Sequence, residues 1–322
     1  MADPWEEFAG NYPIHEESYA LTNIIKENDI KHFSDYDIEE ANRIFSSVIK
    51  ASAGEVPFDG QVQEMFIPSP EVANGIPVSI YKPSNCVQTP AILIYLHGGG
   101  LILFDRKCFE PTLQLIAMEA GCIVVNVEYR LLPNQVNGHA PFDDAKVVAS
   151  WVLENKQKVG GSPESKVGIG GDSAGGQISA SVANDLHGLD FQILIYPNVD
   201  TGPTQPSVDE FANVPLLSKA DIQWFIRHMA KALPDHLTDP RVNVVTRTDL
   251  TSAPSALVLL AQLDTIRDSG MMYAEKLRAA GVKVRIVVIE GVPHCFFMCP
   301  GVFKTKCQEA YGHIANFIKD FQ

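Results

Sequence analysis

A serine between two glycines is the first feature of the sequence that could carry chemistry. Residues 171–175 read GDSAG, directly after the β-rich run 166–169 and before a helical run at 176–186. A sharp strand-to-helix turn exposes a serine hydroxyl, and glycines two positions to either side avoid collisions with the strand and the helix. The alternative is an ordinary serine in a glycine-rich turn. The strand–turn–helix setting favours Ser173 as a nucleophile.

Three consecutive glycines after a histidine form the second such feature. Residues 97–100 read HGGG and follow the apolar run 91–96. Glycines allow the backbone to turn its N–H groups toward one point, where they stabilise a negatively charged oxygen. A nucleotide-phosphate loop is the alternative, but neither G-x-G-x-x-G nor G-K-[ST] follows. The pattern therefore indicates an oxyanion hole.

A serine nucleophile requires a base and an acid, which follow it in the order acid, then histidine, in this setting. His294 is favoured over His313 as the base, because it lies in a loop after the β-rich run 283–289, whereas His313 falls within the terminal helix. Asp264, just beyond a β-rich run, is favoured as the acid. The alternative, Asp268, would begin the next helix, where a carboxylate is favourable in any case.

Two cysteines, Cys295 and Cys299, stand beside His294 and raise the alternative of a metal site. Structural zinc sites usually bring a second close pair of ligands, and the sequence contains none. We therefore expect neither a metal nor an organic cofactor. The six cysteines are expected to be free thiols, because the chain shows no export signal.

The elements that must position these residues are predicted to form a sheet covered by helices. From residue 62 onward, short β-rich runs alternate with helical stretches. The first two runs are close enough to form a hairpin, and most of the others are continuous in Val, Ile and Leu, as buried parallel strands are. The predicted fold class is α/β, with a mostly parallel eight-stranded sheet. Its strands are expected at 62–67, 76–81, 91–96, 122–127, 166–169, 191–196, 255–260 and 283–289.

Two segments do not fit this alternation. Residues 1–58 read as amphipathic helices, and residues 202–245 interrupt the pattern with a proline-rich loop and a helix near 218–232. A sheet protein with an N-terminal helical arm and a helical insertion often joins the two into a cap. We therefore expect a cap made of both segments on a catalytic core of residues 59–201 and 246–322.

Composition limits the partners and the location. The sequence has 25 Lys and Arg against 39 Asp and Glu, a net charge of −14, which disfavours nucleic acid. No apolar run reaches the length of a membrane-spanning helix, and the acidic N-terminus is followed by no apolar stretch typical of a secretory signal. We expect a cytoplasmic protein that acts on a small molecule, and a homodimer is compatible with these observations.

Taken together, these motifs resemble those of the hormone-sensitive-lipase-like carboxylesterases of the α/β-hydrolase fold. The resemblance runs from about residue 60 to the end, whereas the N-terminal segment is similar only in character. It is carried by HGGG at 97–100, YRL at 129–131, GDSAGG at 171–176, LD at 263–264 with Asp268, residues 273–281, and His294 followed by Phe296 and Phe297.

The resemblance implies a role for each site residue. Ser173, Asp264 and His294 would form a catalytic triad. The backbone N–H groups of Gly98, Gly99 and Ala174 would form the oxyanion hole, with His97 bracing the loop. The implied reaction is hydrolysis of a carboxylic ester through an acyl-enzyme intermediate.

Three positions depart from the family pattern. Phe104 and Cys295 stand where the family usually has glycine, and Asn134 stands where it usually has glutamate. Phe104, and Trp224 on the helix near 218–232, are candidates for the substrate pocket, and a ring at position 104 predicts a preference for short-chain esters. Trp224 is equally compatible with ordinary packing.

Two other functions are compatible with the same residues. An amidase or deacetylase would use the same triad on a harder leaving group. A non-catalytic small-molecule receptor on the same fold is disfavoured by the presence of His294. Turnover of matched nitrophenyl ester and anilide substrates separates the three.

Overall fold

The computed structural model describes residues 3–132 and 137–322 of the chain. Eight strands form one sheet in the order β1-β2-β4-β3-β5-β6-β7-β8, in which β2 is antiparallel to both of its neighbours and the other pairs are parallel. This confirms the predicted sheet and its initial hairpin. The strands are β1 (Gly60–Ile67), β2 (Ile76–Pro83), β3 (Ile92–Leu96), β4 (Ile123–Val127), β5 (Val167–Asp172), β6 (Phe191–Ile195), β7 (Ser255–Leu263) and β8 (Val284–Pro293).

Strand β5 continues to Asp172, beyond the end predicted from the sequence. Its glycines hid this part of the strand, because glycine has low β propensity. They are required by close packing: a Cβ atom on Gly168 would lie 2.1 Å from the ring of Phe191, and one on Gly170 would lie 2.8 Å from the carbonyl oxygen of Ile193. The longer strand brings the chain to Ser173, at the carboxyl end of the strand.

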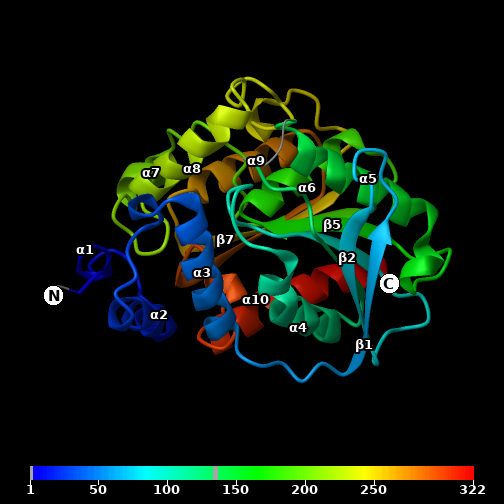
Figure 1. Cartoon of the computed structure of the whole chain (residues 1–322), viewed down its shortest axis with the longest axis horizontal. Coiled ribbons are helices and arrows are strands. Elements are labelled where there is room, and N and C mark those ends of the chain that lie inside the picture. Colours follow the sequence, from blue (N-terminus) through cyan, green and yellow to red (C-terminus); the bar gives the residue numbers. More distant parts are fainter. Residues whose placement is uncertain (1–2, 133–136) are drawn as a thin grey trace.

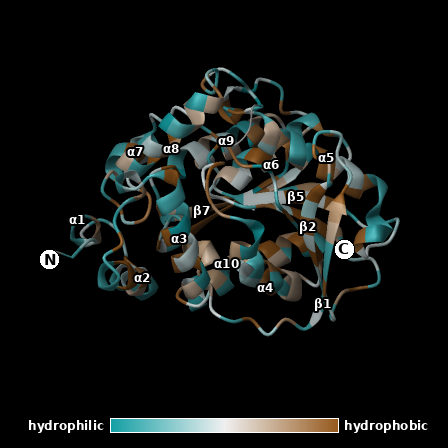
Figure 2. Cartoon of the chain, viewed as in Figure 1, coloured by the Kyte–Doolittle hydropathy of each residue, from teal (hydrophilic) through white to brown (hydrophobic). Residues whose placement is uncertain are grey.

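Helices cover both faces of the sheet. Figure 1 shows α4 and α10 on one face and α5, α6 and α9 on the other. Figure 2 shows hydrophobic residues concentrated on the strands and on the helix faces near them, as expected for two layers of amphipathic helices. These helices are α4 (Glu110–Ala120), α5 (Ala140–Glu154), α6 (Ala174–Asp185), α9 (Arg267–Ala279) and α10 (Lys304–Ile318).

The two segments outside the alternation lie at the same end of the molecule (Figure 1). They contact each other directly: Nδ1 of His32 lies 3.1 Å from Oδ2 of the buried Asp221, and the rings of Phe33 and Phe225 are 5.2 Å apart. The helices of these segments are α1 (Glu6–Ala9), α2 (Glu16–Glu27), α3 (Ile38–Ala53), α7 (Pro206–Glu210) and α8 (Lys219–Ala232). Short 3-10 turns complete the fold: η1 (Phe33–Asp35), η2 (Arg106–Phe109), η3 (Lys156–Val159), η4 (Val244–Thr246), η5 (Phe296–Met298) and η6 (Lys319–Phe321).

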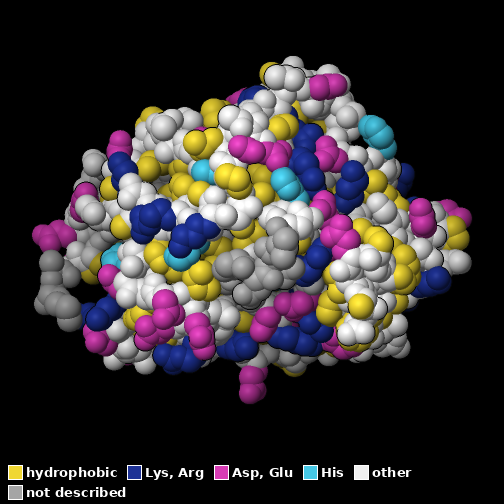
Figure 3. Space-filling model, turned by 45° about the horizontal axis from the view of Figure 1, so that its top comes forward, with side chains coloured by type: hydrophobic (Ala, Val, Ile, Leu, Met, Phe, Trp, Pro, Cys, Tyr) yellow, Lys and Arg dark blue, Asp and Glu magenta, His cyan; other side chains and the backbone are white. Residues whose placement is uncertain are grey.

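Lysine and arginine side chains are interspersed with aspartate and glutamate on the face shown in Figure 3. Among residues 3–132 and 137–322, no helix combines the length and the apolar character needed to cross a bilayer.

Candidate active site

Ser173 occupies a sharp turn between β5 and α6. Its backbone has φ 52°, a conformation that residues other than glycine rarely adopt. The two flanking glycines are sterically required, because Cβ atoms on Gly171 and Gly175 would lie 2.2 and 1.9 Å from the carbonyl oxygen of Leu96. The predicted strand–turn–helix setting is therefore present, and it holds the Ser173 hydroxyl at the end of the sheet.

A chain of hydrogen bonds links Ser173 to a histidine and a carboxylate. Nε2 of His294 lies 3.0 Å from Oγ of Ser173, and Nδ1 of His294 lies 2.7 Å from Oδ2 of Asp264. The side chain of Asp264 is fully buried, and its Oδ1 accepts the backbone N–H of Ile266 at 3.0 Å. This network fixes the orientation of the imidazole ring.

The alternative acid and base lie elsewhere. Asp268 lies in the first turn of α9 and accepts hydrogen bonds from the backbone N–H of Ser207 at 3.0 Å and from Nε of Arg267 at 2.8 Å. His313 lies within α10. The structure therefore brings Asp264 and His294, and neither alternative residue, to the nucleophile.

The glycine loop after β3 requires one correction to the expected oxyanion hole. The N–H of Gly98 donates to Oδ1 of Asp172 at 3.0 Å and is not free to bind a substrate oxygen. Gly99 and Gly100 line the pocket instead. Within the described residues, the N–H groups of Gly99, Gly100 and Ala174 have no protein acceptor. The family resemblance implied Gly98, and it did not reveal that the carboxylate of Asp172 occupies this N–H group.

His97 supports this loop from behind. Its ring is fully buried and stacks on Tyr129 at 4.3 Å and on Phe109 at 5.4 Å between ring centroids. The hydroxyl of Tyr129 donates to the carbonyl oxygen of His97 at 2.7 Å. Burial lowers the pKa of His97, which favours the neutral imidazole, and Nδ1 of this ring lies 2.8 Å from the carbonyl oxygen of Gly98.

Asp172, next to the nucleophile, anchors the loop from below. Its Oδ1 accepts the hydroxyl of Tyr95 at 2.8 Å as well as the N–H of Gly98, whereas its buried Oδ2 has no partner among the described residues. Burial raises the pKa of Asp172 to about 6, against the lowering effect of these hydrogen bonds. The residue therefore fixes the glycine loop, but at neutral pH it is a buried charged carboxylate, which lowers the free energy of unfolding.

This carboxylate predicts the effect of pH on an Asp172→Asn variant. In the folded wild type the pKa of this carboxyl is raised from its ordinary value of 3.8 to about 6. The native state therefore holds a proton that the unfolded chain has lost, and the free energy of unfolding falls by about 3 kcal/mol as pH rises between these two values. Asparagine cannot ionise. The free energy of unfolding of the variant, relative to wild type, should therefore rise by this amount between about pH 4 and about pH 7 in urea denaturation. A difference that is independent of pH would contradict the prediction.

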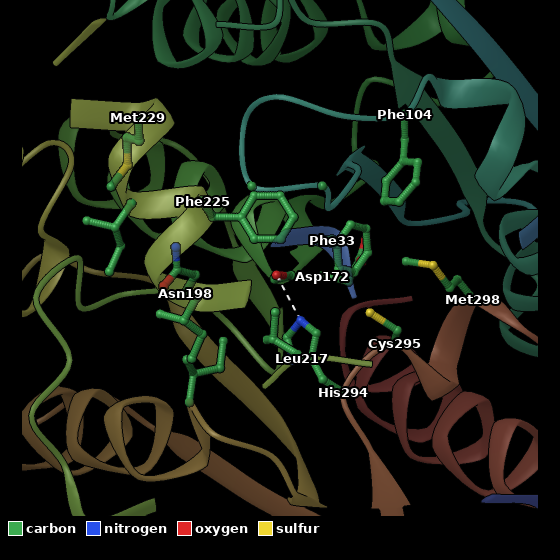
Figure 4. A pocket seen from close by; sticks show the side chains of 16 residues that line it. Phe33, Phe104, Asp172, Asn198, Leu217, Phe225, Met229, His294, Cys295 and Met298 are labelled. Carbon is green, nitrogen blue, oxygen red and sulfur yellow. Dashed lines mark hydrogen bonds between the residues drawn. The ribbon is translucent and has the colours of Figure 1, made fainter. Parts of the chain in front are cut away.

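The pocket above Ser173 is small and mostly apolar. Its cavity volume is ≈ 50 Å³. Figure 4 shows Phe104, Cys295 and Met298 on one side of the Ser173–His294 hydrogen bond and Asn198 and Met229 on the other. Side chains from the N-terminal segment and from the insertion line the pocket as well: Phe33, Leu217, Ile222, Phe225 and Ile226.

Trp224, for which pocket lining and ordinary packing were both open, is not among the residues that line this pocket. It is buried, and its ring packs edge-on against Phe225 and lies 4.5 Å from the ring of His228. Residues at spacings of three and four on α8 share one helix face, and in this helix that face is turned to the pocket through Ile222, Phe225, Ile226 and Met229. Trp224 falls outside this stripe. Helical spacing groups the four residues on one face, and the packed fold decides that this face is turned to the pocket.

Phe104 does line the pocket, in an unusual backbone conformation. Its φ is 75°, and its N–H donates to Oδ1 of Asn42 at 2.7 Å. Cys295, the other position at which the family usually has glycine, also lines the pocket and has φ 69°. Positive φ explains why glycine suits both positions. Asn134 lies outside the described residues.

The two cysteines near His294 are not arranged as metal ligands. In the described part of the chain, no group of three or more His, Cys, Asp and Glu side chains is arranged to hold a metal ion. Cys299 is buried, which raises its pKa to about 12, and burial raises the pKa of Cys295 as well. Both thiols are therefore protonated, a form that binds metals poorly.

Together, the sheet, the turn at Ser173 and the Ser–His–Asp hydrogen bonds have the architecture of an α/β hydrolase. The sequence pattern of the family described as alpha/beta hydrolase fold matches residues 93–298. The chain belongs to this family, in its hormone-sensitive-lipase-like branch of carboxylesterases, which confirms the resemblance noted from the motifs.

Similar proteins of known structure or activity agree with this assignment. Carboxylesterase NlhH of Mycobacterium tuberculosis is 37% identical over 218 residues, covering 66% of this chain and 68% of that protein. Ethyl acetate hydrolase of Pseudomonas putida is 30% identical over 268 residues, covering 81% and 83%. The crystal structure of an esterase from Pyrobaculum calidifontis matches with a TM-score of 0.82 and 29% identity, covering 96% of this chain and 99% of that one.

Proposed function

We propose that this protein is a serine carboxylesterase that hydrolyses short-chain carboxylic esters. The observation that carries the proposal is the continuous hydrogen-bond chain from Oγ of Ser173 through His294 to Asp264, at 3.0 and 2.7 Å. Relatives named carboxylesterase and ethyl acetate hydrolase support ester hydrolysis in particular. An amidase or a non-catalytic receptor is not favoured by these relatives.

The proposed reaction proceeds by acyl transfer. His294 takes the proton of Ser173 as its Oγ attacks the ester carbonyl, and Asp264 holds the imidazole in the required tautomer. The N–H groups of Gly99, Gly100 and Ala174 then stabilise the oxyanion. His294 returns the proton to the departing alcohol. Water hydrolyses the acyl-enzyme with the help of the same base, which regenerates the serine.

Matched substrates test the proposal. 4-Nitrophenyl butanoate and 4-nitrobutyranilide share an acyl group and differ only in the bond that is cleaved. We expect turnover of the ester and turnover of the anilide that is lower by orders of magnitude. Equal turnover of both would identify an amidase, and turnover of neither would favour a receptor.

The preference for short chains rests on the walls of the pocket. Phe104 occupies space that glycine would leave open. Phe33 of η1 and Phe225 of α8 also line the pocket. These rings limit the room for additional methylene groups. Each methylene that cannot be buried forfeits about 0.8 kcal/mol of binding.

Replacing Phe104 by glycine should shift the preferred acyl or alcohol chain toward longer esters. Glycine removes the ring from the pocket and also suits the φ of 75° at this position, so the fold should tolerate it. The profile of kcat/KM across nitrophenyl esters of increasing chain length measures the effect. An unchanged profile would mean that the ring of Phe104 does not limit substrate size.

We further propose that residues 1–58 and 202–245 act together as a cap over the pocket. Phe33 of the first segment and the α8 stripe of the second both line it, which supports a role in substrate binding. The contact of His32 with Asp221 supports their acting as one unit.

A cytoplasmic location and a homodimer stay predictions. The six free cysteines fit a reducing compartment. Fractionation of cells and sedimentation of the purified protein test the two predictions separately.

A further inference from the structure

One polar side chain of the pocket has no part in the proposed chemistry. Asn198 follows β6, and all the other residues between 191 and 200 are buried. Asn198 alone is partly exposed, and it lines the pocket above Ser173. Its backbone N–H donates to the carbonyl oxygen of Ser173 at 3.0 Å. This hydrogen bond fixes the position of Asn198 relative to the nucleophile.

The side-chain amide of Asn198 is not used by the fold. Within the described residues it has no hydrogen-bond partner, whereas amides that support the structure do: Nε2 of Gln177 donates to the carbonyl oxygen of Val242 at 2.6 Å, and Nδ2 of Asn243 donates to that of Leu237 at 2.9 Å. Figure 4 shows Asn198 on the same side of the pocket as Met229. A substrate in this pocket would therefore meet one unpaired donor and acceptor.

Most of the side chains that line the pocket with Asn198 are apolar. Leu217, Ile222, Ile226 and Met229 are among them. A substrate that fills this side with hydrocarbon would displace water from Asn198 without replacing its hydrogen bonds, which costs affinity. A substrate with a hydroxyl or carbonyl group at this position would replace them. Sites of this kind discriminate by rejecting the analogue that lacks the polar group.

We propose that Asn198 is a specificity-determining residue, which selects short esters that carry a second hydrogen-bonding group, a hydroxyl or carbonyl, a few bonds from the scissile ester. The inference rests on the proposed esterase function and adds a substrate class to it. The second group can belong to the acyl part or to the alcohol part, and matched substrates distinguish the two.

Three esters of similar size provide the test: ethyl butanoate, ethyl 3-hydroxybutanoate with the hydroxyl on the acyl part, and 2-hydroxyethyl butanoate with the hydroxyl on the alcohol part. Release of acid is followed in a pH-stat. For wild type we expect kcat/KM of one hydroxy ester to exceed that of ethyl butanoate by about three- to tenfold, the range of one neutral hydrogen bond.

The variant Asn198→Leu should lower this ratio to about one, mainly through a higher KM for the preferred hydroxy ester. Asn198→Ala serves as a second variant with no added bulk and should lower the ratio in the same way. Gln223→Leu is the matched control, because it removes an amide from the exposed side of α8. It should keep the wild-type ratio.

Three results would overturn the inference while leaving the esterase function intact. The first is a wild-type enzyme that hydrolyses ethyl butanoate at least as well as both hydroxy esters. The second is a wild-type ratio in both Asn198 variants, and the third is a ratio that Gln223→Leu lowers as much as they do. Absence of hydrolysis of all three esters would contradict the proposed function itself, and the inference with it.

Discussion

Replacing Ser173 by alanine should lower kcat by roughly 10⁴ or more, with no loss of fold. Ser173 forms the acyl-enzyme bond in the proposed reaction, and its Oγ is the group 3.0 Å from Nε2 of His294. Because the three residues act as a unit, His294→Ala should cost about as much as Ser173→Ala. Asp264→Asn should cost somewhat less, since the imidazole keeps its position and loses only its preferred tautomer.

Asp268→Asn is the matched control for the acid. Asp268 is four residues from Asp264 in the sequence, but it hydrogen-bonds to Ser207 and Arg267 and not to His294. We expect a mild effect on kcat. Steady-state kinetics on a short nitrophenyl ester, with circular dichroism to check folding, measures all four variants. Near-native activity of Ser173→Ala, or a larger loss in Asp268→Asn than in Asp264→Asn, would contradict the assignment.

The variant Gly99→Ala should lower kcat by roughly 10² to 10³. The φ of Gly99 is 111°, and a Cβ atom there would lie 2.3 Å from the carbonyl oxygen of Leu103, so the loop must move. Its N–H then leaves the position where the oxyanion forms. Because this interaction belongs to the transition state, kcat and kcat/KM should fall equally while KM stays nearly constant.

Gly281→Ala separates this effect from backbone strain. Gly281 also has a positive φ, 87°, but a Cβ atom there meets nothing within 4 Å, and it lies after α9, far along the chain from the glycine loop. This variant should lose stability and keep its kcat. If Gly99→Ala kept kcat within about threefold of wild type while folded, the N–H of Gly99 would not serve the oxyanion.

The serine turn illustrates what short-range sequence patterns can predict. A Cβ atom on Gly171 would lie 2.5 Å from the backbone carbonyl carbon of Gly175, a steric requirement within the turn itself that produces a short motif. The same holds for the strands, whose continuous Val, Ile and Leu follow from burial on both faces. The serine turn and the strands were predictable because local steric requirements and the hydrophobic pattern can both be read from neighbouring residues.

The differences from expectation arose where distant segments meet. Gly98 was predicted to bind the oxyanion, but its N–H faces a carboxylate 74 residues away. Trp224 was a candidate for the pocket, but Phe225 lines it instead. Both cases concern which way a group points, and that is decided by the neighbours the fold supplies.

The fold class, the nucleophile, and the order in which acid and base follow it were therefore predictable from the amino-acid sequence, because each depends on local sterics and on periodic burial. Three-dimensional packing, in contrast, decides which N–H groups stay free and which side chains of α8 form the pocket wall. It also places Asn198, which follows β6, on the wall of the same pocket as residues of α8. Such contacts have no spacing rule in the sequence, because many side chains of the right type compete for each position and the packed fold selects among them.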